Sequence, residues 1–148
     1  VLFLLSEANG WSQSYYEQGV RASMEKWNID SAKINAFVAA LPPANKQNVL
    51  TQKYVSLFMQ PFEAWAEYRR TGYPNTLLLP GQSAALNVAT ASGQTTYTFT
   101  SLIADLTDLP TRIYYPTTVQ TLNTDNYKAA STAIGGDKMN TKLIWDKN

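Results

Sequence analysis

The 148-residue sequence predicts a mainly α-helical fold of paired helices, with long irregular loops and a small β-hairpin. In the helical part, residues 1–73, hydrophobic side chains recur every three to four positions, and Gly and Pro mark segment ends. Charges are sparse in the loop-rich part, residues 74–117, and a final helix and tail follow at 118–148. Paired short helices are typical of tetratricopeptide-like arrays, although the repeat signature is absent.

Residues 1–8 are expected to end one helix at Asn9-Gly10, a good C-terminal signal. The next helix is predicted to begin near Ser14, which has capping-box spacing to Glu17. Its apolar stripe comprises Tyr16, Val20, Met24 and Trp27. Gly19 costs this helix about 1 kcal/mol relative to Ala, so we expect a neighbouring helix to approach closely there.

A third helix is predicted after Asp30-Ser31 and ends at Pro42-Pro43, because proline disfavours helical geometry before it. A fourth begins near Asn45. Pro61 breaks or kinks it, and helical periodicity then resumes until Gly72 stops it. Aromatic residues on the helical stripes are assigned to the core: Tyr16, Trp27, Phe37, Tyr54, Phe58 and Trp65.

In the second half, Ser92-Gly93 is a turn candidate between residues 87–90 and 95–100, and the latter segment alternates like a strand. Residues 109–116 read as extended. A last helix is predicted from Thr118 to Ala133, before Gly135-Gly136. The tail at 141–146 is expected to be a short apolar strand or coil.

The composition excludes most catalytic templates. No His or Cys is present, which removes His-based acid–base catalysis, disulfides, thiolate nucleophiles and the common zinc sites. The net charge of +1 argues against a nucleic-acid partner, because phosphate contacts need a concentrated basic surface. We expect no cofactor and no metal.

Two groups of carboxylates leave alternatives open. Glu63 and Glu67 share a helix face and are an acid–base pair candidate for glycoside hydrolysis, or simply a solvated face. Oxygen ligands for calcium are available from Asp105, Asp108, Asp137 and Asn140, although turn and cap roles explain them more simply. Arg69-Arg70 is either an anion site or a helix end complemented by cations.

The aromatic residues indicate binding. An aromatic face can stack on a sugar ring while Asn, Gln and Thr side chains form hydrogen bonds with the hydroxyl groups of the sugar. The chain is rich in aromatic residues and in these polar residues. Four aromatic residues placed in turns or loops are the ligand-binding candidates: Trp11, Tyr73, Tyr97 and Phe99. Simple packing is the alternative, because loop aromatics are also often buried.

Several ordered segments resemble the SusD/RagB family of nutrient-binding lipoproteins of Bacteroidetes, especially its SusD-like starch-binding branch that associates with the outer membrane. The most specific is Glu-Ala-Trp-Ala-Glu-Tyr-Arg-Arg-Thr-Gly-Tyr-Pro at 63–74. Further matches lie at residues 4–8, 16–24, 52–58, 110–116, 123–127 and 135–145. Three features depart from the family pattern: Val119 stands where Glu is usual, Ile144 replaces a Trp, and the turn at 9–13 is short.

The resemblance implies a non-enzymatic protein that captures oligosaccharides, or peptides, at the extracellular face of the outer membrane. It would deliver them to a SusC-like TonB-dependent transporter. It also implies a lipid anchor at an amino terminus outside this sequence, so that residues 1–148 would be the carboxy-terminal part of a SusD-like domain. A carboxylate-based glycoside hydrolase and a purely structural helical adaptor remain the alternatives.

Overall fold

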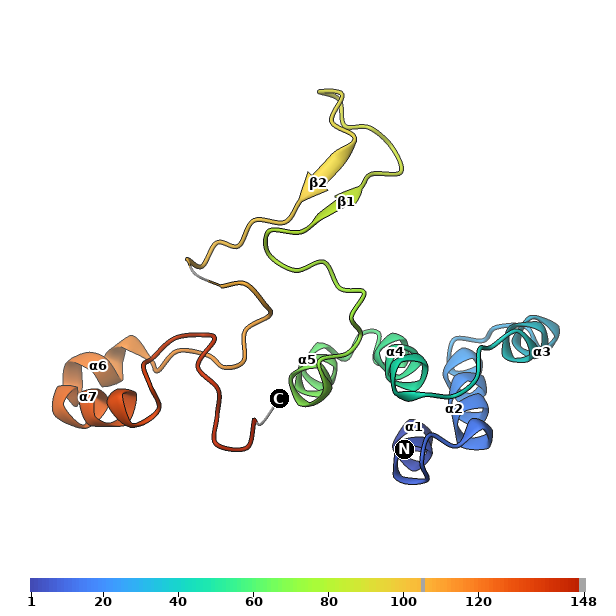
Figure 1. Ribbon diagram of the computed structural model, residues 1–148, viewed down its shortest axis with the longest axis horizontal. Coiled ribbons are helices and arrows are strands. Elements are labelled where there is room, and N and C mark those ends of the chain that lie inside the picture. Colours follow the sequence, from blue (N-terminus) through green and yellow to red (C-terminus); the bar gives the residue numbers. More distant parts are fainter. Residues whose placement is uncertain (105, 147–148) are drawn as a thin grey trace. The chain divides into compact units, whose positions relative to one another are not determined.

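The computed structural model describes residues 1–104 and 106–146 (Figure 1). The chain divides into two compact units, which we call the helical unit (Val1–Thr76) and the loop unit (from Leu77 onward). The helical unit holds α1 (Leu2–Ala8), α2 (Gln13–Lys26), α3 (Ser31–Ala39), α4 (Lys46–Ser56) and α5 (Pro61–Thr71). The loop unit holds β1 (Ser83–Ala85), β2 (Thr96–Thr98), α6 (Thr117–Leu122) and α7 (Thr124–Ala133). The mainly α prediction is confirmed.

Side-chain caps start two helices where the sequence predicts them. The Asp30 carboxylate accepts hydrogen bonds from the backbone N–H groups of Ala32 and Lys33, which begins α3. The Asn45 side chain accepts from the Asn48 N–H at 2.9 Å, which begins α4. Both caps satisfy N–H groups that lack a partner within the helix.

The predicted capping box of α2 is wrong. The helix already begins at Gln13, after Ser12, so Ser14 lies inside the first turn. Two hydrogen bonds across the preceding turn explain the earlier start, because Ser12 N–H donates to the Ser6 carbonyl and the Ser6 hydroxyl donates to the Ser12 carbonyl. They bring Ser12 directly to the start of the helix.

Pro61 starts a new helix instead of kinking the fourth one. It occupies the first turn of α5, where a missing N–H costs nothing because that position has no intrahelical acceptor. Met59, with φ of 65°, turns the chain between α4 and α5. Gly72 ends α5 in the left-handed conformation, as predicted.

The helical unit has an apolar core shared by its first four helices. Six buried residues form it: Phe3, Tyr16, Val20, Ile34, Val38 and Val49. A Cβ atom at Gly19 of α2 would lie 2.9 Å from the Phe3 ring of α1. The predicted close approach of a neighbouring helix at Gly19 is therefore confirmed.

Only part of the predicted aromatic core is buried. Tyr16 is fully buried, and Tyr54 and Trp65 are half-buried. Trp27, Phe37 and Phe58 are exposed by 45%, 44% and 62% of their surfaces, so their assignment to the core is wrong. Trp27 and Phe58 lie just past the ends of α2 and α4, where the helical stripe no longer faces the core. Their rings contact each other edge to face at 5.5 Å.

The loop unit contains the predicted hairpin, but the first strand lies earlier than expected. Ser83, Ala84 and Ala85 pair antiparallel with residues 96–98, and residues 87–90 belong to the connecting loop. The Ser83 and Thr98 hydroxyls, 2.7 Å apart, link the strands on one face. Gly93, with φ of 79°, turns at the end of the loop and donates its N–H to the Thr90 carbonyl.

The predicted last helix is two helices. Asn123, with φ of −140°, interrupts it between α6 and α7, and the Thr124 hydroxyl bonds back to the Gln120 carbonyl. Residues 109–116 carry no helix, in agreement with the extended prediction. Within the described tail residues there is no strand, so the coil alternative holds.

Candidate functional site

The hairpin positions two of the four predicted binding residues. Tyr97 lies on β2 opposite Ala84, and 47% of its surface is exposed. Phe99 continues the ladder, since its N–H donates to the Gln82 carbonyl and its carbonyl accepts from Gly81. Tyr97 and Phe99 thus lie two residues apart, on a backbone held by hydrogen bonds.

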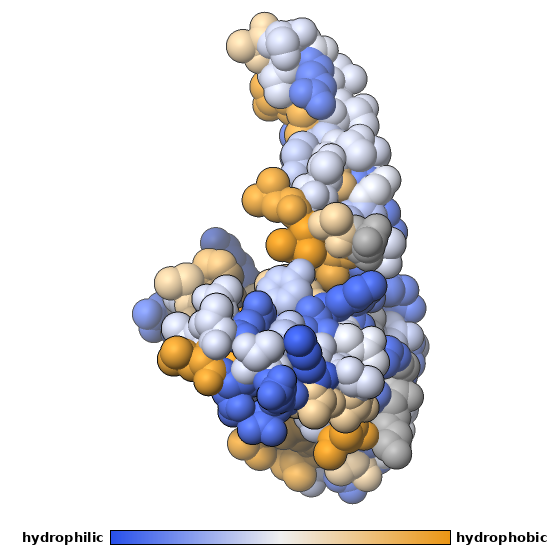
Figure 2. Space-filling model, turned by 90° about the vertical axis from the view of Figure 1, so that its left-hand side faces the viewer, coloured by the Kyte–Doolittle hydropathy of each residue, from blue (hydrophilic) through white to orange (hydrophobic). Residues whose placement is uncertain are grey.

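A groove of about 380 Å³ lies at the base of this hairpin. We call it the hairpin groove; its lining includes Thr98, Phe99, Thr100, Ser101 and Thr107. Its volume falls within the roughly 300–1,000 Å³ of ligand pockets. In Figure 2 the hairpin, at the top of the view, is mostly pale, with a few hydrophobic residues toward its base. A ring beside hydroxyl groups is suited to a neutral, hydroxyl-bearing ligand.

The hydroxyl groups of this groove differ in availability. The Thr98 hydroxyl pairs with Ser83, and the Ser101 hydroxyl bonds Ile103 of the following turn. Those of Thr100 and Thr107 make no hydrogen bond with the described part of the chain. Sequence reasoning missed these two threonines. The alternation of Thr with aromatics at 95–100 was the available signal, although it does not mark the groove.

Trp11 and Tyr73 lie in the helical unit and are both partly buried. Trp11 packs against the apolar core, and this packing accounts for much of its ring surface. The Lys46 ammonium lies 5.4 Å from the centroid of the Tyr73 ring, a cation–π distance. Binding roles for these two residues remain predictions.

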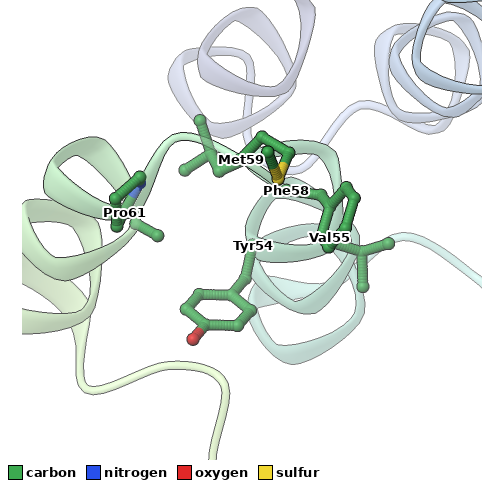
Figure 3. Close-up of a pocket in the computed structure, with 7 residues that line it drawn as sticks. Tyr54, Val55, Phe58, Met59 and Pro61 are labelled. Carbon is green, nitrogen blue, oxygen red and sulfur yellow. The ribbon is translucent and has the colours of Figure 1, made fainter. Parts of the chain in front are cut away.

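A second, more apolar groove of about 790 Å³ lies where α4 ends and α5 begins (Figure 3). Tyr54, Val55, Phe58, Met59 and Pro61 line it, together with Leu57 and Ala64. None of the four predicted binding residues takes part. Tyr54 and Phe58 were assigned to the core because they continue the apolar stripe of the fourth helix. That helix ends at Ser56, so Phe58 lies beyond its end.

Glu63 and Glu67 occupy different environments. Glu63 is exposed, whereas Glu67 is buried and paired with Lys53 at 2.8 Å and Arg70 at 2.7 Å. Burial alone would raise the pKa of Glu67, but the hydrogen bonds and charges of Arg70 and Lys53 outweigh it and lower the pKa. A carboxylate held ionised in this way is a poor proton donor, which is the role that glycoside hydrolysis requires of one member of the pair.

Arg70 links its own helix, α5, to α1. It forms a bidentate pair with Glu7 of α1 at 2.7 and 2.8 Å, as well as its bond to Glu67. The hydrogen bonds with Glu7 and Glu67 raise the pKa of Arg70. Arg69 lies 4.5 Å from the Trp65 ring centroid. Carboxylates and a ring therefore already meet these two cations, which disfavours the anion-site interpretation.

The calcium alternative finds no support in the described residues. Asp108 accepts from the Leu109 N–H, a turn role, and Asp137 pairs with Arg112 at 3.1 Å. Asp105 lies outside the described residues. No three acidic side chains are grouped to hold a metal ion in the part of the chain that is described. In the same part, no helix is long and apolar enough to span a bilayer.

Comparison with known proteins places these features in context. The sequence model of a SusD-like family, described as "Starch-binding associating with outer membrane", matches residues 1–100. No curated protein matches the chain. Among solved structures, a "Bacteroidetes AC2a SusD-like" protein is 29% identical with a TM-score of 0.74, and a "chitin-binding protein" is 29% identical with a TM-score of 0.72. Each match covers 99% of this chain but only 29% and 32% of the respective relative.

Proposed function

Because the chain belongs to the SusD-like family described as starch-binding and associating with the outer membrane, we propose that it serves non-catalytic capture of oligosaccharides at the cell surface. The family match over residues 1–100 carries this proposal. That region includes the hairpin and all four predicted binding residues. A solved relative named for chitin binding supports a glycan as the ligand class.

The hairpin groove is the contact site in this proposal. Phe99 and the exposed Tyr97 offer ring faces to the apolar side of a sugar, and the hydroxyls of Thr100 and Thr107 bond its hydroxyl groups. The ladder around Phe99 fixes this arrangement before the ligand arrives, which lowers the entropy cost of binding. Trp11 and Tyr73 are proposed as further contacts.

The proposal extends to delivery. The captured oligosaccharide passes to a SusC-like TonB-dependent transporter, and the protein is held at the extracellular face of the outer membrane by an amino-terminal lipid. The family description supports the membrane association. Transporter partnership and the anchor follow from the resemblance of segments such as 63–74 and 110–116.

A glycan panel tests the proposal. Isothermal titration with maltohexaose and chitohexaose should show binding, and product analysis of the same mixtures should show no shortened oligosaccharide. Phe99→Ala removes one stacking face and should weaken binding about fivefold, since an aromatic contact contributes roughly 1 kcal/mol. Ile113→Ala, at an exposed apolar residue outside the groove, is the matched control.

The outcomes separate the alternatives. Hydrolysis that disappears in Glu67→Gln or Glu63→Gln would establish the hydrolase and overturn capture. Absence of any glycan or peptide binding would favour the structural adaptor. Binding that is equal in wild type and Phe99→Ala would remove the hairpin groove as the contact site.

A further inference from the structure

A smaller pocket of about 190 Å³ lies in the loop unit, between α6, α7 and Tyr115. We call it the Tyr–Asn pocket, after its two tyrosines and two asparagines. Its lining consists of Tyr115, Val119, Asn123, Asn126, Tyr127 and Ala130. It shares no lining residue with the hairpin groove.

A buried ion pair fixes the two tyrosines of this pocket. Asp137 accepts from the Tyr115 N–H and from the Tyr127 hydroxyl, each at 3.2 Å. Arg112 pairs with the same carboxylate at 3.1 Å, and its guanidinium lies 4.5 Å from the centroid of the Tyr115 ring. The side chains of Arg112 and Asp137 are only 7% and 5% exposed. The frame that holds the pocket walls is thus formed before any ligand binds.

The two rings have complementary orientations. Their centroids are 6.0 Å apart and their planes are inclined by 88°. In this arrangement the edge of one ring contacts the face of the other, which fixes both rings in the pocket wall. Val119 and Ala130 supply aliphatic surface beside them. The walls are suited to the flat C–H face of a small cyclic ligand.

The two asparagines give the pocket its polar side. Asn126 donates from its amide nitrogen to the Asn123 side-chain oxygen at 2.9 Å. Neither the Asn123 amide nitrogen nor the Asn126 side-chain oxygen has a hydrogen-bond partner within the described residues. One donor and one acceptor therefore remain, on adjacent side chains. Neighbouring hydroxyl groups of a sugar match such a pair.

We propose that the Tyr–Asn pocket binds a single pyranose ring of a glycan. The inference rests on the proposed glycan capture and adds a second, independent contact to the hairpin groove. The ring packs against Tyr115 and Tyr127 while Asn123 and Asn126 bond its hydroxyls. The pocket volume of about 190 Å³ is below the roughly 300–1,000 Å³ of pockets for larger ligands, so the pocket has room for one ring and not for a longer stretch of chain.

Nuclear magnetic resonance of the isotope-labelled 148-residue chain tests this inference. Titration with maltohexaose and with chitohexaose should shift the side-chain amide signals of Asn123 and Asn126 and the backbone signal of Tyr115. Asn126→Ala removes the side-chain acceptor. The glycan affinity measured at the remaining Asn123 and Tyr115 signals should weaken about fivefold, which is the effect of losing one hydrogen bond. Asn140→Ala, an exposed asparagine outside the pocket, should change nothing.

A second variant keeps the test independent of the amide pair. Val119→Phe fills the pocket without removing a hydrogen bond and should abolish the glycan shifts at Asn123 and Asn126. Shifts confined to Tyr97 and Phe99, with unchanged affinity in both variants, would overturn the Tyr–Asn pocket but leave glycan capture standing. If no glycan shifts any signal, both proposals fail. If a neutral peptide shifts the Asn signals and neither glycan does, the pocket is a peptide site and this inference is wrong.

Discussion

The helical unit and the loop unit are each stabilised internally by a different kind of interaction. The helical unit has an apolar core, with Tyr16, Val20, Val49 and Leu50 at most 2% exposed. In the loop unit the buried centre is polar: the side chains of Arg112 and Asp137 are only 7% and 5% exposed, and their ion pair organises the surrounding backbone. One unit is stabilised mainly by removing apolar surface from water, the other by a buried polar centre. Mutations should therefore affect the units separately and for different reasons.

Arg112→Ala should have the largest effect. It leaves the Asp137 carboxylate buried without its partner, which costs about 3–5 kcal/mol when a buried pair is broken. Hydrogen exchange should accelerate at the amides of Thr111 and Tyr115, which bond Met139 and Asp137. The Val49 amide in the helical unit should remain protected. Lys138→Ala, at the exposed neighbour of Asp137, serves as the control.

Leu50→Ala is the converse test, because it should destabilise the helical unit and leave the loop unit unchanged. Leu50 is 1% exposed, and such truncations cost about 2–5 kcal/mol. Urea unfolding followed by helical circular dichroism should show this loss, whereas Val55→Ala, 58% exposed on the same helix, should change stability by about 0.5 kcal/mol or less. If Leu50→Ala accelerates hydrogen exchange at the Thr111 amide as much as at the Val49 amide, the two units unfold together and are not stabilised separately.

The helical unit also contains one polar centre, and pH should reveal it. The folded pKa of Glu67 lies below its reference of 4.5, so its stabilisation is complete above that pH and is lost as the pH falls through the folded value. Glu67→Gln should lower the free energy of unfolding by about 2 kcal/mol at neutral pH, because the hydrogen bonds of Glu67 are made with the charged groups of Lys53 and Arg70. Melting curves should show the difference from wild type shrinking between about pH 5 and 3. Glu63→Gln, exposed on the same helix, should follow the wild-type pH profile.

Val119→Glu should have the smallest effect, and it is a gain. The Nη1 atom of Arg112 is buried without a hydrogen-bond partner in the described structure. Val119 lines the same pocket as Tyr115, over which the guanidinium lies. A glutamate there should reach Nη1 and stabilise the loop unit by about 1 kcal/mol. Slower exchange at Tyr115 would confirm it; Val119→Gln should recover less, because its oxygen carries no charge.

The sequence predicted local features better than long-range ones. The helix ends at Asn9-Gly10 and Gly72, and the helix starts near Asp30 and Asn45, were predicted because their signals lie within a few residues of the helix end. The close approach at Gly19 was also foreseen, since an unfavourable residue in a helix needs a compensating contact. The hairpin register was missed because it depends on pairing with a strand more than ten residues away. The break at Asn123 was missed although the hydrogen bonds around it are local, such as that from the Thr124 hydroxyl to the Gln120 carbonyl.

The candidate sites show the same division. Tyr97 and Phe99 were singled out from an alternating segment, but neither the groove beside them nor the Tyr–Asn pocket was identified. Glu67 looked equivalent to Glu63 in sequence. The difference arose only in the folded chain, where α4 supplies Lys53 to Glu67 and α1 supplies Glu7 to its other partner, Arg70. Burial, partners and cavities are properties of several segments together.

The amino-acid sequence by itself determined the mainly α class and several of the helix ends, because propensity, capping and periodicity act over neighbouring residues. Only the tertiary structure decided which aromatic rings are buried and which remain open to a ligand. It also decided that Arg112 and Asp137, 25 positions apart in sequence, form one centre. The physical reason is that desolvation and ion pairing depend on distance in space, and folding alone brings distant residues together.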